Sequence, residues 1–185
     1  MKLSAPGIDT IIISEVRIIK EVKMLIFIEG PDGSGKTTLC KELVECGAAD
    51  ILINVPRGTK NQRDIYDLLC RSSHKIVFDR CFISDLVYRL WDNCKTDDMT
   101  LDDMLCVLTR YNSRVIFCQT DTAFDDAQKR GESFITNRKN HDIISSNYSV
   151  IQNLLRKFTT VPVMVYDRKY SDVSDVIKFT EEGGN

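Results

Sequence analysis

Nine residues near the start of the chain have the types and the spacing that bind the phosphates of a nucleotide. From Gly30 to Thr38 they read Gly-Pro-Asp-Gly-Ser-Gly-Lys-Thr-Thr, and they follow the apolar run 24–28. Glycines at this spacing let successive backbone N–H groups curl around a phosphate, and the helix that follows begins with its positive dipole end facing the anion. We therefore expect a phosphate-binding loop between a buried strand and a helix, in a chain that binds a nucleoside triphosphate.

The polar side chains of this loop have separate expected roles. Lys36 is expected to reach the β- and γ-phosphate oxygens as a point charge, and the Thr37 hydroxyl to ligate the Mg²⁺ ion that bridges them. A chance turn is a weak alternative, because roughly one random chain of this length in a hundred would contain the pattern. The predicted ATP-binding residues are Gly30, Asp32, Gly33, Ser34, Gly35, Lys36, Thr37 and Thr38.

A carboxylate and a guanidinium follow another apolar run. The run 75–78 ends in Asp79 and Arg80, which places both side chains at the carboxyl edge of a sheet, beside the phosphate loop. We interpret Asp79 as a second partner of the magnesium ion. Arg80 is suited to hold an anionic acceptor in a bidentate fork, a task for which arginine is better shaped than lysine. A salt bridge at the end of the strand is the alternative interpretation.

Alternating patterns predict the elements that must position these residues. Short apolar runs typical of buried strands lie at 24–28, 51–55, 75–78, 114–118 and 161–166. Helical spacing occupies the segments 38–46, 64–71, 82–94, 101–111 and 143–158. Strands that alternate with helices predict a parallel sheet covered on both sides. The predicted fold is an α/β, P-loop NTPase-type three-layer sandwich with a five-stranded parallel sheet and, at about 121–140, a short polar lid that we expect to be mobile.

Composition limits the classes of partner. The chain has 185 residues, 43% of them hydrophobic and 28% charged, as expected for one globular domain. Its net charge of −2 comes from interspersed signs, so we expect neither nucleic acid nor a membrane as a partner. Seven cysteines without a C-x-x-C pair favour reduced thiols and a cytoplasmic location. Residues 1–23 are apolar but interrupted by charges. We interpret them as an N-terminal extension, either an artefact preceding a true start at Met24 or an added strand or amphipathic helix.

Two motifs resemble those of the thymidylate kinase family. The segment 27–38 is similar to the opening of these kinases, whose phosphate loop carries a carboxylate where Asp32 stands. The segment 79–88 is similar to their D-R-Y-x-x-S-x-x-x-Y segment, and 163–179 matches their usual terminal strand and helix. The resemblance implies a nucleoside monophosphate kinase domain at 24–185. It also implies phosphoryl transfer from ATP, with Mg²⁺, to dTMP or a related deoxynucleoside monophosphate, and it leaves a homodimer open.

The resemblance also implies which residues bind the acceptor. Asp32 would meet the acceptor's 3′-hydroxyl, and Arg80 and Arg57 its phosphate. The acceptor pocket would be lined by Ser84, Tyr88 and Tyr148.

The resemblance further implies where a catalytic arginine comes from. Members of the family with glycine after the loop carboxylate, as at Gly33 here, take this arginine from the lid. Arg130 and Arg138 are then the candidates that join Lys36 in neutralising charge on the transferred phosphoryl group. A solvated flap is the alternative for these cations.

Some residues depart from the family pattern. Cys81 replaces the aromatic residue of the D-R-Y motif, and the stretch between Arg57 and Asp79 is shorter than in the family. That stretch normally supplies the residues that read the thymine ring. The base is therefore open, and dCMP, dGMP and dUMP are candidates beside dTMP.

The nearest alternative function is that of a deoxynucleoside kinase, which must remove a proton from a neutral 5′-hydroxyl with a general base. That family usually places a carboxylate at the end of the second strand. Residues 51–58 contain no Asp or Glu, which favours a monophosphate acceptor, although Asp79 could serve as a base. A nucleotide-dependent switch is disfavoured because the chain has no N-K-x-D run and because the cationic flap suits transfer better than signalling. A polynucleotide kinase needs a basic channel for the strand, which the net charge of −2 disfavours.

Overall fold

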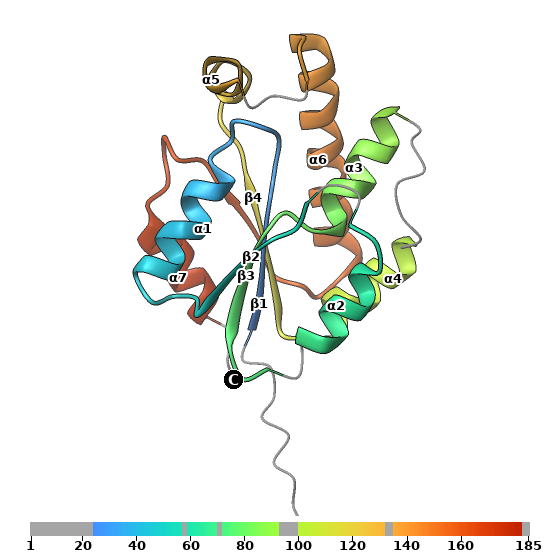
Figure 1. The fold of residues 1–185 in the computed structure, drawn as a ribbon, viewed down its shortest axis with the longest axis vertical. Helices are drawn as coiled ribbons and strands as arrows, with labels where there is room; N and C mark the ends of the chain where they lie inside the picture. Colours follow the sequence, from blue (N-terminus) through green and yellow to red (C-terminus); the bar gives the residue numbers. More distant parts are fainter. Residues whose placement is uncertain (1–23, 57–58, 70–71, 93–99, 132–134, 183–185) are drawn as a thin grey trace, which may run out of the picture.

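A parallel β-sheet runs through the centre of the molecule (Figure 1). The computed structural model describes residues 24–56, 59–69, 72–92, 100–131 and 135–182. Within these ranges the sheet has the strand order β2-β3-β1-β4-β5. Its strands are β1 (Met24–Glu29), β2 (Ile51–Asn54), β3 (Lys75–Asp79), β4 (Ser113–Cys118) and β5 (Val163–Tyr166). The predicted five-stranded parallel sheet is confirmed. The N-terminal extension predicted at 1–23 lies outside the described residues.

The burial of the strands follows their place in the sheet. Every residue of β1 and β4 is buried, and so is β3 apart from its first residue. These strands have neighbours on both sides and helices on both faces, which is why they read as continuous apolar runs. The edge strands β2 and β5 are mostly half-buried, so the expectation of full burial was wrong for them.

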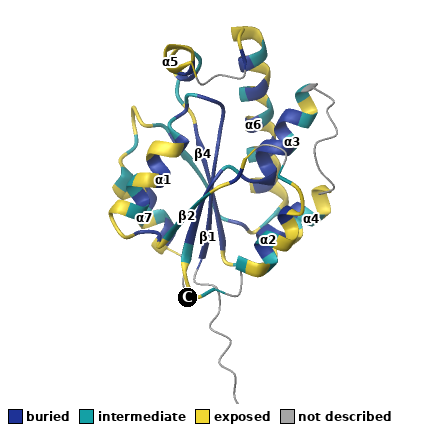
Figure 2. Ribbon diagram, viewed as in Figure 1, coloured by how far each residue is buried: buried dark blue, intermediate teal, exposed yellow. Residues whose placement is uncertain are grey.

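Helices in the described ranges form the two outer layers, which confirms the predicted sandwich (Figure 1). The helices α1 (Lys36–Glu45) and α7 (Val173–Glu181) cover one face. The opposite face is covered by α2 (Gln62–Leu69), α3 (Phe82–Asp92), α4 (Leu101–Arg110) and α6 (Arg138–Phe158). Each face has its own apolar core, and Figure 2 shows the buried helix surfaces turned toward the sheet. None of these helices has both the length and the apolar character needed to cross a bilayer.

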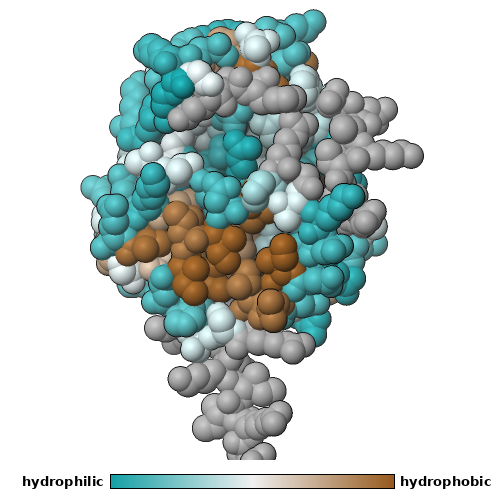
Figure 3. All heavy atoms as spheres, in the orientation of Figure 1, coloured by the Kyte–Doolittle hydropathy of each residue, from teal (hydrophilic) through white to brown (hydrophobic). Residues whose placement is uncertain are grey.

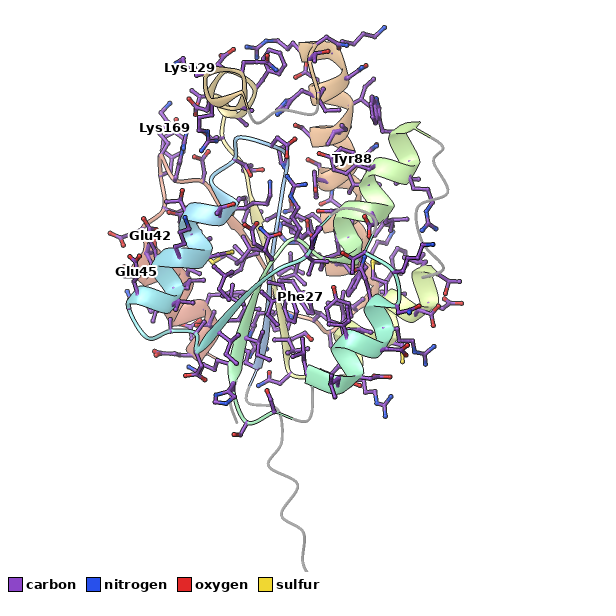
Figure 4. The ribbon with its side chains drawn as sticks, in the orientation of Figure 1. Phe27, Glu42, Glu45, Tyr88, Lys129 and Lys169 are labelled. Atoms are coloured by element: carbon purple, nitrogen blue, oxygen red, sulfur yellow. The ribbon has the colours of Figure 1, made fainter. Side chains whose placement is uncertain are left out.

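An aromatic cluster anchors the layer that carries α2 and α3. Phe27 points from β1 toward α2 (Figure 4) and stacks on Phe78 with 5.0 Å between ring centroids. Tyr66 and Phe82 meet Phe27 from the two helices at 5.7 and 5.6 Å. This cluster fixes α3, whose first turn follows Asp79 and Arg80, relative to the strand that leads into the phosphate loop.

The predicted lid contains a helix that the sequence analysis did not anticipate. Helix α5 (Ala123–Arg130) lies beyond the carboxyl end of the sheet, and α6 begins at Arg138, five residues before the predicted helical segment. Only Ala123 and Ala127 of α5 are buried. Two small buried residues among charged ones give little apolar periodicity, which is why the segment resembled a polar flap.

The front of the molecule and the surface above it differ in hydropathy. Figure 3 shows apolar side chains gathered on the front of the molecule, where Figure 1 places the edge strand β2. Above this patch, toward the carboxyl ends of the strands, the surface is hydrophilic. The polar residues predicted to act on phosphates belong to this upper edge.

Candidate active site

The phosphate loop connects β1 to α1 as predicted. Gly35 has φ 92°, a left-handed conformation that favours glycine, and it forms the N-cap of α1. The Lys36 Nζ lies inside the loop, where it donates hydrogen bonds to the carbonyl oxygens of Gly30 and Pro31, both at 2.7 Å. Burial lowers the pKa of Lys36, and the nearby guanidinium of Arg80 lowers it further. The two hydrogen bonds to carbonyl oxygens counteract these effects and hold the Lys36 amine inside the loop before any phosphate enters.

A cavity of about 300 Å³ opens in front of this loop. It is formed by the loop, by the first residues of α1, and by Lys41, Arg80 and Arg130. Among the described residues, four cations including Lys36 line the cavity, and Asp32 contributes the one carboxylate. Such an excess of positive charge suits a polyphosphate. Of the predicted ATP-binding residues, Gly30 and Ser34 belong to the loop but do not line this cavity.

The two predicted metal-binding residues lie in direct contact. The Thr37 hydroxyl donates a hydrogen bond of 2.6 Å to Asp79 Oδ2. Asp79 is 2% exposed, and its Oδ1 is buried without a hydrogen-bond partner among the described residues. A buried carboxylate oxygen in this position needs a positive or hydrogen-bonding partner. Because Mg²⁺ prefers hydroxyl and carboxylate oxygens, the residues present fit this ion.

Arg80 and Asp32, both predicted to bind the acceptor, are paired with each other. The Arg80 guanidinium donates to Asp32 Oδ1 at 2.5 Å, and the two side chains are 32% and 7% exposed. Burial by itself lowers the pKa of Arg80, but the carboxylate of Asp32 raises it above its usual value. Arg80 therefore stays charged at the cavity wall, with part of its guanidinium accessible to a second anion.

The structure separates the two lid arginines. Arg130, the last residue of α5, lines the cavity, and its Nε donates to the carbonyl oxygen of Asp126 at 3.3 Å. Arg138 instead donates to Asp125 at 2.5 Å and lies 4.8 Å from the ring centroid of Phe124. It does not line this cavity. Arg130 is thus the better placed of the two to meet a phosphoryl group.

The residues predicted to line the acceptor pocket are buried between helices. Tyr88 lies between α3 and α6 (Figure 4), with its ring edge-on to Trp91 at 6.5 Å. The hydroxyls of Ser84 and Tyr148 lie 3.0 Å apart and contact the carboxylate of Glu29. Arg57, the second predicted phosphate ligand, lies outside the described residues.

Helix α5 rests directly on the phosphate loop. A Cβ atom at Gly33, where φ is 84°, would lie 1.8 Å from the carbonyl oxygen of Ala123. No side chain fits at this position while α5 is seated. A larger side chain at this position would therefore displace α5 from the loop.

Three residues of the site were missed by the sequence analysis. Lys41 follows Thr37 by one helical turn, a spacing that could have placed it on the cavity side of α1. His141 of α6 is buried, with its Nε2 3.3 Å from the carbonyl oxygen of Asp32. Glu29 ends an apolar strand as a buried acid, which is an unusual place for a carboxylate.

Comparison with known proteins identifies the fold. No family model and no curated protein matches the chain. Among solved structures, the YorR protein of Bacillus subtilis in complex with phosphorylated GDP matches with a TM-score of 0.61 at 18% identity, over 83% of this chain and 91% of that one. The chain has the fold of the P-loop nucleotide kinases.

Two further solved structures support this assignment of the fold. Deoxyadenosine kinase from M. mycoides, with products dCMP and dCDP bound, has a TM-score of 0.57 at 18% identity and covers 85% of this chain and 96% of its own. Thymidylate kinase from Ehrlichia chaffeensis matches with a TM-score of 0.56 at 18% identity, over 86% of this chain and 99% of that one. The fold is therefore common to kinases that take different acceptors.

Proposed function

We propose that the protein transfers the γ-phosphoryl group of ATP to a deoxynucleoside monophosphate, dTMP or a related one, giving ADP and the diphosphate. The observation that supports this most is the cavity at the phosphate loop, where the described lining has four cations, Lys36, Lys41, Arg80 and Arg130, and one carboxylate. A donor triphosphate and an acceptor monophosphate bring many negative charges to one place. Cations in this number can hold both anions together.

In this proposal the chemistry needs positioning and charge neutralisation. An oxygen of the acceptor phosphate attacks the γ-phosphorus, the bond from the γ-phosphorus to the β,γ-bridging oxygen breaks, and ADP leaves with the electron pair. The acceptor phosphate is already an anion, so no side chain has to remove a proton. Lys36 and Arg130 neutralise charge on the transferred group, and Arg80 holds the acceptor phosphate.

Magnesium belongs to this proposal as the partner of ATP. Thr37 and Asp79 are the residues that would hold it, and when bound it neutralises charge on the β- and γ-phosphate oxygens. Asp32 keeps Arg80 oriented and is the group that would contact the acceptor's sugar. The partners are small nucleotides in the cytoplasm, and the identity of the base is left open.

A deoxynucleoside kinase is the second candidate. It is favoured by one observation, the carboxylate of Asp32 at the cavity, which could accept the proton of a 5′-hydroxyl. The pairing of that carboxylate with Arg80 opposes this role, because the guanidinium occupies Oδ1, one of the two oxygens that could accept the proton.

A coupled assay that detects ADP separates the two candidates. The protein is offered ATP and Mg²⁺ with each common deoxynucleoside and, separately, with each deoxynucleoside monophosphate. We expect turnover with at least one monophosphate and background rates with the nucleosides. Turnover with nucleosides alone would reject the proposed function in favour of the second candidate.

A further inference from the structure

A buried carboxylate next to the phosphate loop has no role in the mechanism above. Glu29 is the last residue of β1, immediately before Gly30, and is 0% exposed. Its Oε1 accepts hydrogen bonds from the backbone N–H groups of Cys81 at 2.7 Å and Ser84 at 3.3 Å. Its Oε2 accepts from the hydroxyls of Ser84 at 2.6 Å and Tyr148 at 3.4 Å.

These contacts join three elements at one point. Cys81 directly precedes α3, Ser84 lies in its first turn, and Tyr148 lies in the middle of α6. The first N–H groups of a helix have no partner within the helix, and they favour a negative charge. Glu29, at the end of β1, thus caps α3, the helix that follows β3.

The residue just before this capped turn has a strained backbone. Arg80 has φ 74°, in the left-handed region that residues other than glycine rarely adopt. Such a conformation persists only where the surroundings fix it. Here Ile28 and Glu29 do so, because the Arg80 N–H donates to the Ile28 carbonyl oxygen at 3.1 Å and the next N–H, of Cys81, donates to Glu29. This turn directs the guanidinium of Arg80 onto Asp32 at the cavity.

Packing alone does not account for the carboxylate. Burial raises the pKa of Glu29, and the hydrogen bonds from Cys81 and Ser84 counteract this rise. An acid in a protein interior is costly compared with an apolar side chain of the same size. Its use at the end of β1 therefore calls for a reason connected with the groups that it holds.

We propose that Glu29 is a positioning residue for the acceptor, which fixes the Arg80 guanidinium at the phosphate cavity by anchoring the turn that carries it and by tying α6 to the same point through Tyr148. The inference rests on the proposed function, in which Arg80 holds the acceptor phosphate. Glu29 itself touches neither nucleotide.

The test compares Glu29→Gln with the wild type. Glutamine keeps the size of the side chain but removes the charge and places an amide N–H₂ group where two hydroxyls now donate. We expect the KM for the acceptor monophosphate to rise about tenfold, because charged hydrogen bonds are lost, while the KM for ATP stays within about twofold. Glu29→Asp keeps the charge, so its KM for the acceptor should lie between those of the wild type and Glu29→Gln.

A matched control removes a purely structural explanation. Ile26→Val, on the same strand and equally buried, should lower the melting temperature without changing the ratio of the two KM values. An equal rise of both KM values in Glu29→Gln, or a lower melting temperature with an unchanged acceptor KM, would overturn the inference.

A structural measurement keeps this test independent of the acceptor. In a crystal structure of nucleotide-free Glu29→Gln, Arg80 should leave its left-handed conformation and lose its ion pair with Asp32. An unchanged Arg80 would contradict the positioning role even if kinetics changed. If the wild type used no monophosphate while Arg80 shifted as expected, the proposed function would fail and the role of Glu29 would stand.

Discussion

At the scale of single residues, charged groups of the site are held by partners that a nucleotide would replace. Lys36 binds two loop carbonyl oxygens, and Thr37 donates to Asp79. The ammonium of Lys36 is held at the loop by these carbonyl oxygens, which phosphate oxygens could replace as its partners. The site is therefore preorganised, which reduces the cost of ordering it during the reaction.

The first residue-scale prediction concerns Lys36. Lys36→Ala should lower kcat/KM at least about a hundredfold, because Lys36 supplies the only ammonium inside the loop among the described residues. Lys41→Ala is the control, since Lys41 lines the same cavity from the side of α1 and should have a smaller effect. Steady-state kinetics with ATP as the varied substrate measure both. Near-normal turnover in Lys36→Ala would mean that this loop is not the donor site.

The lid arginines allow a sharper comparison. Arg130→Ala should lower kcat about a hundredfold or more, with little change in ATP affinity, because an arginine that meets the phosphoryl group acts mainly in the transition state. Arg138→Ala, which removes a pair with Asp125 away from the cavity, should change kcat only a few-fold. The comparison requires kcat and an ATP titration for each variant. Equal losses in the two variants would contradict the assignment of Arg130.

The site residues that could be predicted from the sequence are those that belong to a recognisable motif. The loop and the pair Asp79 and Arg80 follow apolar runs, so their place at the sheet edge could be derived. The partners of Glu29 could not be derived, because they lie more than fifty positions later in the chain. The pairing of Arg138 with Asp125 likewise depends on a helix that was not predicted.

At the scale of elements, α5 closes the site and brings Arg130 to the cavity. Its first residue lies against Gly33, and Asp126 is ion-paired with Arg168, which follows β5. The helix ends at Gly131, which is left-handed with φ 64°. Local sequence did not reveal this helix because its stability comes from contacts with the loop and with Arg168 more than from an apolar face.

Two glycine substitutions test whether α5 must rest on the phosphate loop. Gly33→Ala should lower both kcat and the melting temperature, because the new methyl group collides with Ala123 and pushes α5 away. Gly131→Ala introduces a similar left-handed strain, but nothing lies within 4 Å of the added atom, so it should cost only about 1 kcal/mol of stability. Steady-state kinetics and thermal unfolding give the kcat and the melting temperature of both variants. Similar kcat values in the two variants would show that α5 does not need to sit on the loop.

A further element-scale prediction concerns the start of α4. Thr100 and Asp103 form a reciprocal capping box, and the hydrogen bonds from Thr100 hold the pKa of Asp103 below its usual value. Because the pKa is lower in the folded state, this contribution to stability is present at neutral pH. It is lost in acid as the pH falls through the lowered pKa.

Thermal unfolding of Asp103→Ala tests this linkage. The variant should melt at a lower temperature than the wild type at neutral pH, and the difference should shrink in acid. Asp102→Ala, in the same turn but outside the box, is the control and should change little. A difference that is constant over the whole pH range would mean that the charge of Asp103 does not contribute.

At the scale of the whole molecule, the sheet brings the site together from distant parts of the chain. The loop after β1, the turn after β3 and helix α5 after β4 meet at the carboxyl ends of three adjacent strands. This architecture was predictable, because each central strand is a continuous apolar run separated from the next by helical spacing. The strand order and the seat of α5 were not, since both depend on contacts between segments far apart in sequence.

The central claim is that donor and acceptor phosphates meet in the single cavity in front of the phosphate loop. A crystal structure with a non-hydrolysable ATP analogue, Mg²⁺ and a deoxynucleoside monophosphate tests it most directly. We predict that the acceptor phosphate lies within hydrogen-bond distance of the Arg80 guanidinium, beside the γ-phosphate analogue and Arg130. A monophosphate bound away from Arg80 and from residues 30–38 would contradict the account.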